Sequence, residues 1–256
     1  MESFQLKASG LKKVYGRRGN TYTAIKEFDL KLEKGEFVGI MGPSGSGKTT
    51  LLNILSTIDQ PTEGDVEING TPLSGMKDKD LALFRRDHLG FIFQDYNLLD
   101  TLTLEENIAL PLALAKTDTD EISKRIGEIS ERLGIKNLLG KYPYEVSGGQ
   151  LQRTAAARAM IVRPELIFAD EPTGALDSKS ATELLQMLSE MNQRESMTLL
   201  MVTHDAFSAS YSDRIVFLRD GELFTELGRG RQSRREYFQR ILDVLSAMGG
   251  GVHDLV

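Results

Sequence analysis

The residues best suited to chemistry lie in one glycine-rich segment of this 256-residue chain. The run 42–49 fits the phosphate-loop pattern G-x-x-x-x-G-K-[ST] at every defined position. Its glycines allow turns that bring successive backbone N–H groups around an anion. Lys48 would contact the β- and γ-phosphates of a nucleotide, and the Thr49 hydroxyl would bind Mg²⁺. The predicted nucleotide contacts are Gly42, Pro43, Ser44, Gly45, Ser46, Gly47, Lys48, Thr49 and Thr50.

The surroundings of this segment favour a phosphate site over an ordinary glycine-rich turn. The apolar run 37–41 before it is typical of a buried strand. Leu51, Leu52 and Leu55 after it recur at helical spacing, so a helix begins near Lys48. The positive end of the helix dipole would therefore face the bound phosphates.

A second segment of the same kind lies further along the chain. Ser147, Gly148, Gly149 and Gln150 form a turn that opens a predicted helix. By the same dipole argument this helix start is a second anion site. Two phosphate-type helix starts in one chain of this length suggest that two copies share nucleotides.

Two adjacent carboxylates, Asp170 and Glu171, follow the predicted strand 166–169. They cannot both face the core, because successive side chains of a strand alternate. The pair fits one carboxylate near a metal ion and one that positions the attacking water. The alternative is a strand followed by an acidic turn, which the neighbouring phosphate loop makes less favourable.

Gln94 and His204 also come at the ends of predicted strands, 89–93 and 198–202. Open α/β sheets place ligands at the carboxyl ends of their strands. Gln94 could there coordinate Mg²⁺ or orient water, but a polar residue at the edge of the core is the alternative. A lone histidine is often structural, yet the strand-end position that His204 shares with Asp170 favours a role in the site.

Tyr15 lies in a β-rich opening that the sequence predicts before the phosphate loop. An exposed aromatic ring close to a nucleotide site can stack on adenine. The local sequence leaves open the alternative of a core residue in a hairpin.

Helical spacing without any strand pattern marks residues 98–161. We expect one helix from Leu104 that ends at Pro111, and a second over 120–133 that stops at Gly134. These helices form a subdomain inserted into a core of predicted strands. The chain then divides into a first core part (1–97), the helical subdomain (98–161), a second core part (162–230) and a C-terminal amphipathic helix and tail (231–256).

Composition excludes several classes of protein. The chain has no cysteine, which excludes disulfides and thiolate metal sites. Its formal charge of -6 argues against a nucleic-acid binder, which would need a basic face. The N-terminus lacks the apolar core of a signal peptide, and the apolar patch 108–115 is too short to cross a bilayer. A role at a membrane would need another chain to span it.

From Leu6 to about Leu227 these motifs together resemble the ATP-binding subunit of ABC transporters. In this resemblance Tyr15 belongs to the aromatic loop that stacks on adenine, and 42–49 is the Walker A loop. Gln94 is the Q-loop glutamine, a Mg²⁺ ligand and a link to the membrane partner. The resemblance implies an α/β, RecA-like P-loop NTPase core with an N-terminal antiparallel β-subdomain and an inserted helical subdomain.

The later motifs carry the same resemblance. The run 146–150 matches the family signature LSGGQ, with Val146 in place of the usual leucine. Walker B ends at Asp170, near the metal, and Glu171 is the catalytic glutamate that follows it. Asp177 ends the D-loop, and His204 is the switch histidine that senses the γ-phosphate.

A finer resemblance is to the branch of lipoprotein-release, macrolide-export and peptide-resistance ATPases. The segments 93–99, 105–112 and 170–178 carry it. The tail from Glu222 to Leu242 is most similar to bacitracin-type peptide-resistance ATPases.

The resemblance implies an ATPase that dimerises around two Mg-ATP and drives a separate integral-membrane permease from the cytoplasmic face of the membrane. Peptide-resistance complexes can also signal to a sensor histidine kinase. One alternative is a lipoprotein-release or macrolide-export ATPase, and another is a regulatory module that moves no substrate. A non-transport ATPase is less favoured, because the sequence has neither a long coiled-coil insertion nor tandem ATPase units.

The C-terminal tail carries an apolar stripe wide enough for the core-facing side of a helix. One interpretation packs the stripe on this chain's own core or on its dimer mate. The other docks it on the permease or the membrane surface, helped by nearby arginines. The stripe consists of Tyr237, Phe238, Ile241, Leu242, Leu245 and Met248.

Overall fold

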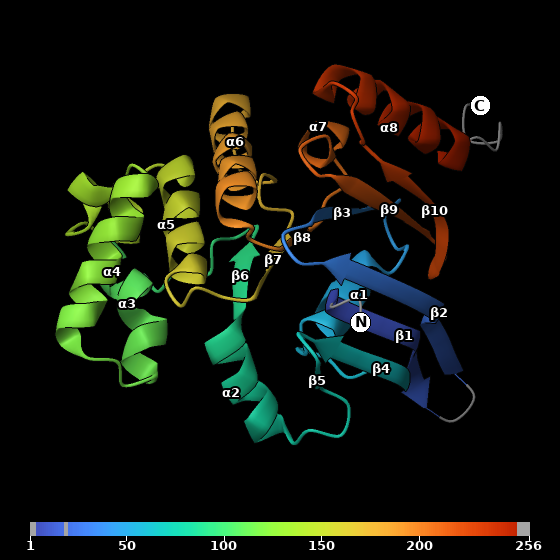
Figure 1. Ribbon diagram of the computed structural model, residues 1–256, viewed down its shortest axis with the longest axis horizontal. Coiled ribbons are helices and arrows are strands. Elements are labelled where there is room, and N and C mark those ends of the chain that lie inside the picture. Colours follow the sequence, from blue (N-terminus) through green and yellow to red (C-terminus); the bar gives the residue numbers. More distant parts are fainter. Residues whose placement is uncertain (1–3, 18–19, 250–256) are drawn as a thin grey trace.

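The computed structural model describes residues 4–17 and 20–249, which form a ten-stranded sheet with helices on both faces (Figure 1). The strands are β1 (Phe4–Arg17), β2 (Asn20–Glu33), β3 (Phe37–Met41), β4 (Glu63–Ile68), β5 (Thr71–Pro72), β6 (Leu89–Phe93), β7 (Leu166–Asp170), β8 (Leu199–Val202), β9 (Arg214–Arg219) and β10 (Glu222–Gly228). The helices are α1 (Lys48–Leu55), α2 (Asp78–His88), α3 (Leu104–Leu114), α4 (Thr119–Arg132), α5 (Gly148–Met160), α6 (Ser178–Glu195), α7 (Ala206–Ala209) and α8 (Arg234–Gly249), with the 3-10 turns η1 (Lys136–Leu138) and η2 (Pro143–Glu145).

The strand order β5-β4-β1-β2-β10-β9-β3-β8-β7-β6 places an antiparallel part beside a parallel part. β1 pairs antiparallel with β2 and β4, which is the antiparallel β-region expected at the N-terminus. β2 alternates between exposed side chains and the buried Phe28, Leu30 and Leu32, so only one of its faces packs on the core. The expected fold class, a P-loop α/β core with this β-region, is confirmed.

β3 is the strand around which the parallel part is built. All five of its residues are buried, and it pairs in parallel with β8 and β9. Its side chains alternate: Val38 and Ile40 pack with the leucines of α1, whereas Phe37 and Met41 face the helices on the other side of the sheet. Because both faces are covered, only the loops at the strand ends can carry a site for a ligand.

The elements between residues 98 and 161 are helical, and they lie together at one end of the molecule (Figure 1). α3 does not end at Pro111 as expected but continues to Leu114. Proline removes one N–H donor, but the buried Leu112 and the bond from Ala115 N–H to the Pro111 carbonyl (3.1 Å) hold the last turn. The division of the chain into domains at these boundaries stays a prediction.

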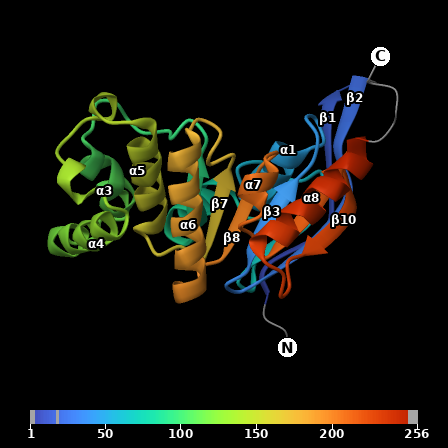
Figure 2. The same ribbon diagram turned by 90° about the horizontal axis from the view of Figure 1, so that it is seen from above.

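The C-terminal stripe packs on this chain's own core, as the first interpretation expected. Tyr237, Ile241 and Met248 of α8 are buried against Met41 and Phe217 of the sheet. Figure 2 shows α8 lying beside α7. The sequence predicts that the three glycines 249–251 end this helix; Gly249 is the last residue of α8, and Gly250 and Gly251 lie outside the described residues. In the described ranges no helix is both long enough and apolar enough to cross a bilayer.

Candidate nucleotide site

The loops that follow β3, β7 and β8 meet at the carboxyl edge of the sheet and enclose a cavity of about 530 Å³. Three of the predicted site segments contribute to its walls, although they are spread over the sequence from Gly42 to His204. A fourth contribution comes from the end of α8. The lining residues are Gly42, Pro43, Ser44, Lys48, Glu171, His204, Leu245, Met248 and Gly249.

The loop before α1 has a conformation that its glycines make possible. Gly47 is the N-cap of α1 and has a φ of 99°, in the left-handed region that favours glycine. A Cβ on Gly42 would lie 2.1 Å from the carbonyl oxygen of Leu218 in β9, so no other residue fits there. The N-cap carries no side chain, and the first N–H groups of α1 stay available to an anion.

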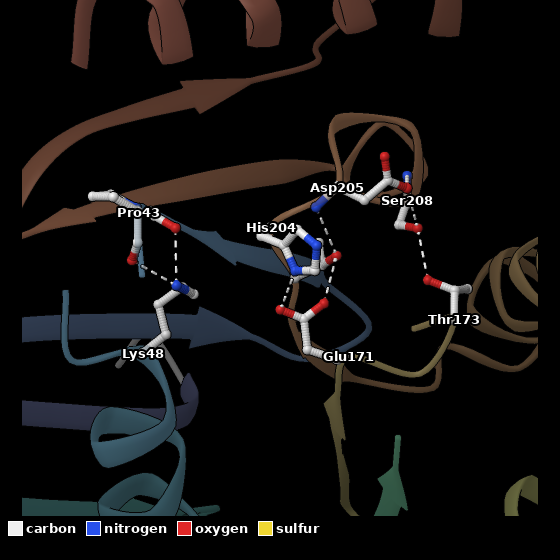
Figure 3. A network of polar contacts seen from close by, with 9 residues as sticks. Pro43, Lys48, Glu171, Thr173, His204, Asp205 and Ser208 are labelled. Atoms are coloured by element: carbon white, nitrogen blue, oxygen red, sulfur yellow. Dashed lines mark hydrogen bonds and ion pairs between the residues drawn. The ribbon is translucent and has the colours of Figure 1, made fainter. Parts of the chain in front are cut away.

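Lys48 folds back over this loop (Figure 3). Its ammonium donates to the carbonyl oxygens of Gly42 (2.8 Å) and Pro43 (2.9 Å). Burial lowers the pKa of Lys48, and the negative charges of Glu171 and Asp170 oppose that shift. The ammonium therefore lies where it can exchange loop carbonyls for phosphate oxygens.

The surroundings of Asp170 destabilise its negative charge, which a bound cation would compensate. Burial raises its pKa, the like charge of Glu171 raises it further, and only Lys48 opposes the shift. Asp170 and the exposed Thr49 hydroxyl are hard oxygen donors of the kind Mg²⁺ prefers. No group of three or more metal-binding side chains occurs in the described part of the chain. This fits Mg²⁺, which is usually held by one or two protein oxygens together with phosphates.

Glu171 is anchored to the end of β8 by three contacts. Its N–H donates to the Val202 carbonyl (2.9 Å), and its backbone has a φ of 47°, which is uncommon outside glycine. One carboxylate oxygen lies 2.8 Å from Nδ1 of His204, and the other accepts a bond from the Thr203 hydroxyl (3.3 Å). The Glu171 side chain is 17% exposed and that of His204 is 73% exposed. His204 is therefore the more movable member of the pair.

Thr203 is a residue that the sequence did not single out. It is fully buried, and its hydroxyl accepts the N–H of Asp205 (3.1 Å), so its proton is directed at Glu171. The network continues from Asp205 to the Ser208 hydroxyl (2.7 Å) and from there to Thr173 (2.9 Å), as Figure 3 shows. The loops after β7 and β8 thus form one hydrogen-bonded unit. The sequence signal that could have identified Thr203 is its position as a polar residue directly after an apolar strand.

Tyr15 is 40% exposed, which does not favour the alternative of a hairpin core residue. Its hydroxyl donates to Asp59 (2.8 Å), and the Lys13 ammonium lies 4.9 Å from the ring centroid. Across the strand pair, the exposed Tyr22 directs its hydroxyl at the Gly45 carbonyl (3.5 Å). Both rings therefore belong to the edge of the β-region beside the phosphate loop, and Tyr22 was not predicted.

Gln94 does not line the cavity but follows β6 as an exposed residue against the loop after β7. A Cβ on Gly174 would lie 2.9 Å from its amide carbon. Just behind it, the buried Gln152 of α5 donates to the carbonyls of Phe93 (3.1 Å) and Pro172 (2.7 Å). Gln152, also unpredicted, connects the helical region to the loops on both sides of the site.

The second predicted anion site is separate from the cavity. Ser147 is the N-cap of α5, where its hydroxyl accepts the Gln150 N–H (3.4 Å) and the Gln150 side chain accepts the Ser147 N–H (3.0 Å). The segment lies in the helical end of the molecule, away from α1 (Figure 1). A Cβ on Gly149 would lie 2.7 Å from the Ser180 hydroxyl, so the segment fits closely against α6.

Asp177 is the N-cap of α6 and lies next to this segment. It accepts bonds from the N–H groups of Lys179 and Ser180 (both 3.0 Å) and from the Ser180 hydroxyl (2.7 Å). The bonds to the charged form, led by the Ser180 N–H, lower the pKa of Asp177. Asp177 and the Ser147 segment thus form a second surface within the chain, distinct from the cavity.

A family model described as "ABC transporter" matches residues 25–174. The ABC transporter ATP-binding protein YvcR of Bacillus subtilis is 55% identical over 97% of this chain and 96% of its own length. The bacitracin export ATP-binding protein BceA of Halalkalibacterium halodurans is 49% identical over 97% of this chain and 98% of its own length.

Solved structures show the same relationship. MJ0796 of Methanocaldococcus jannaschii, in a dimeric post-hydrolysis state bound to ADP and Pi, matches with a TM-score of 0.80 and 40% identity, over 87% of this chain and 98% of that one. The family model spans the phosphate loop, the Ser147 segment and Glu171. The chain is thus an ATP-binding, ATP-hydrolysing subunit, and it belongs to the ABC transporter family.

Proposed function

We propose that two copies of this chain enclose two Mg-ATP molecules, each bound between the phosphate loop of one copy and Ser147, Gly148 and Gly149 of the other. The observation that carries the proposal is the separation of these two helix starts within one chain. The cavity beside α1 contains no residue of the Ser147 segment. Only a second copy can bring that segment to the phosphates, and the dimeric structures of MJ0796 support this arrangement.

Within each site, we assign phosphate binding to the loop amides of 42–50 and to Lys48. Glu171 accepts a proton from the attacking water, and His204 holds the γ-phosphate in place. Thr49, Asp170 and Gln94 would hold a Mg²⁺ ion, which would neutralise charge on the phosphate oxygens. Gln150 and Asp177 act from the partner's side of the site.

The adenine end of the site belongs to Tyr15 in this proposal. One face of its ring lies near Lys13, and its hydroxyl is held by Asp59, so the ring has a fixed orientation. A fixed aromatic ring can stack on a base with little loss of side-chain entropy.

A groove of about 450 Å³ between α2, β6 and α3 is our proposed binding site for the permease. Ile58 and Leu114 expose apolar surface there, and Arg85, Arg86 and Arg158 add positive charge. The groove begins next to Phe93, whose carbonyl is held by Gln152. A cytoplasmic segment of an integral-membrane permease in this groove would connect to the nucleotide site and hold the chain at the cytoplasmic face of the membrane.

The likeness to the bacitracin export protein BceA supports bacitracin-type peptide resistance as the transporter's task. A sensor histidine kinase is a further proposed partner, which rests only on the resemblance of the sequence to peptide-resistance ATPases. A strain that lacks the chain should become more sensitive to bacitracin. Complementation with the wild type, but not with Lys48→Ala, should restore growth. Unchanged sensitivity in the deletion strain would contradict this substrate class.

The shared site has a direct test that uses mixed dimers. Lys48→Ala removes the phosphate ligand, and Ser147→Arg blocks the opposite surface, so each variant alone should lose ATPase activity. In a mixed dimer one site combines the intact phosphate loop of one chain with the intact Ser147 segment of the other. Mixing the two variants should therefore restore part of the activity. A mixture that stays as inactive as its components would contradict the proposal.

A further inference from the structure

The cavity at the phosphate loop has a wall that none of the nucleotide motifs supplies. Leu245, Met248 and Gly249, in the last two turns of α8, line it together with Lys48 and Glu171. The chain therefore returns to its nucleotide site almost 200 residues after the phosphate loop.

The position of α8 is fixed by contacts along its first half. Ser233 caps the helix through a capping box with Glu236, whose carboxylate accepts the Ser233 N–H (2.9 Å). The guanidinium of Arg234 lies 4.3 Å from the ring centroid of Tyr211. Tyr237 is fully buried and donates its hydroxyl to the Leu227 carbonyl (2.7 Å). The end of α8 is consequently held at the cavity by the rest of the helix.

The last turns of α8 have an inner and an outer side. Met248 is buried against the core, and Leu245 is half-buried at the cavity. Ser246, Ala247 and Gly249 are exposed and small. A surface of small residues lets another backbone approach closely.

We propose that the last two turns of α8 form part of the interface with the second copy when the nucleotide sites close. This inference rests on the proposed shared site, because the partner's Ser147 segment must cover the cavity that Leu245 and Met248 line. If the second copy covers this cavity, it must also contact the end of α8 at the rim of the cavity. The α8 contact is therefore continuous with the nucleotide-sandwich interface.

The permease groove does not compete for the same surface. It lies between α2 and α3, whereas α8 lies on the opposite side of the molecule, beyond the parallel strands (Figure 1). Residues 244–249 contain no charged side chain, so this end of α8 has no feature that anionic lipid headgroups would attract.

The absence of cysteine in the natural sequence allows a direct test of the contact. Single cysteines are placed at Ser246, in the proposed contact, and at Gln239, exposed on the first half of the same helix. Both are made in the Glu171→Gln background, which should retain ATP binding and hydrolyse ATP far more slowly. Mg-ATP should slow the reaction of a thiol reagent with Ser246→Cys by at least about tenfold and leave Gln239→Cys unchanged, since thiol reactivity follows access.

Two further measurements separate the partner contact from other causes. Mg-ADP at a concentration where sedimentation shows monomer occupies the cavity without a partner, so protection under that condition would overturn the inference. A dimer with no protection at position 246 would also overturn it while leaving the shared site intact. If ATP produces no dimer, both the proposed shared site and the proposed α8 contact are contradicted.

A matched pair of leucine-to-alanine substitutions gives a second measurement. Leu242 and Leu245 are both half-buried leucines of α8 that pack on the same core cluster, but only Leu245 lines the cavity. Leu245→Ala should weaken ATP-driven dimerisation at least about threefold more than Leu242→Ala, as for a side chain inside an interface. Equal effects of the two substitutions would show that α8 acts only by stabilising the fold.

Discussion

Nδ1 of His204 lies 2.8 Å from a carboxylate oxygen of Glu171, at the ends of two neighbouring strands of the sheet. The other oxygen of Glu171 is held by Thr203, so both oxygens of the carboxylate have a partner. His204 can leave because it is exposed, whereas Thr203 is buried and cannot. We infer that Thr203 keeps Glu171 oriented while His204 turns toward the γ-phosphate.

Glu171→Gln should retain ATP binding and reduce turnover by roughly two to four orders of magnitude, the range expected for loss of a general base. Fluorescent-nucleotide titration and a phosphate-release assay measure the two quantities. Glu165→Gln is a matched control, because Glu165 also lies beside a histidine, His88 (3.0 Å), but away from the cavity. Turnover near wild type for Glu171→Gln would remove Glu171 from this role.

Thr203→Val should lower kcat by roughly tenfold with little change in KM, because the lost hydrogen bond orients Glu171 and contributes about 1.4 kcal/mol. Thr203→Ser keeps the hydroxyl and should restore most of the rate. Steady-state kinetics measure kcat and KM of both variants, and thermal melting checks that they are folded. If serine and valine variants lose activity equally, packing and not the hydroxyl is the cause.

Asp170→Asn should raise the melting temperature of the nucleotide-free chain near pH 7, by roughly 1–3 °C. The folded chain raises the pKa of Asp170, so ionisation of this group costs stability. That cost is absent below the ordinary aspartate pKa of 3.8 and grows as pH rises from there to the folded value. The difference between variant and wild type should therefore shrink as pH falls toward 3.8.

The same Asp170→Asn variant should lose the extra stabilisation that Mg-ATP gives over ATP with a chelator, because it lacks the proposed metal ligand. Scanning calorimetry with and without Mg²⁺ measures this difference. A full Mg²⁺-dependent shift in the variant would place the metal elsewhere.

Tyr237→Ala should destabilise the chain by roughly 3–5 kcal/mol, because it empties a fully buried aromatic site between α8 and the sheet. Tyr237→Phe removes only the bond to the Leu227 carbonyl and should cost about 1 kcal/mol. Urea unfolding measures both. Tyr144→Ala, at a side chain that is 74% exposed, should stay within about 0.5 kcal/mol of wild type.

Local patterns in the sequence are enough to locate several parts of this protein. The phosphate loop was identified because its glycines, Lys48 and Thr49 are consecutive, and a strand and a helix must flank them. Asp170, Glu171 and His204 were identified because they lie at or just after the ends of buried strands. The amphipathic spacing of the tail predicted α8 and its buried side. In each case neighbouring residues supply both the structure and the chemistry.

Other features depend on contacts between residues far apart in the chain, and they become visible only in the folded structure. Pro111 does not end α3, because the packing of Leu112 outweighs the lost backbone bond. Thr203 faces Glu171 only because β7 and β8 pair in parallel with a fixed register. Leu245 reaches the phosphate cavity because Tyr237 fixes α8 against the sheet. Helical spacing shows which residues share a face, but the contacts of that face depend on packing free energy summed over the whole fold.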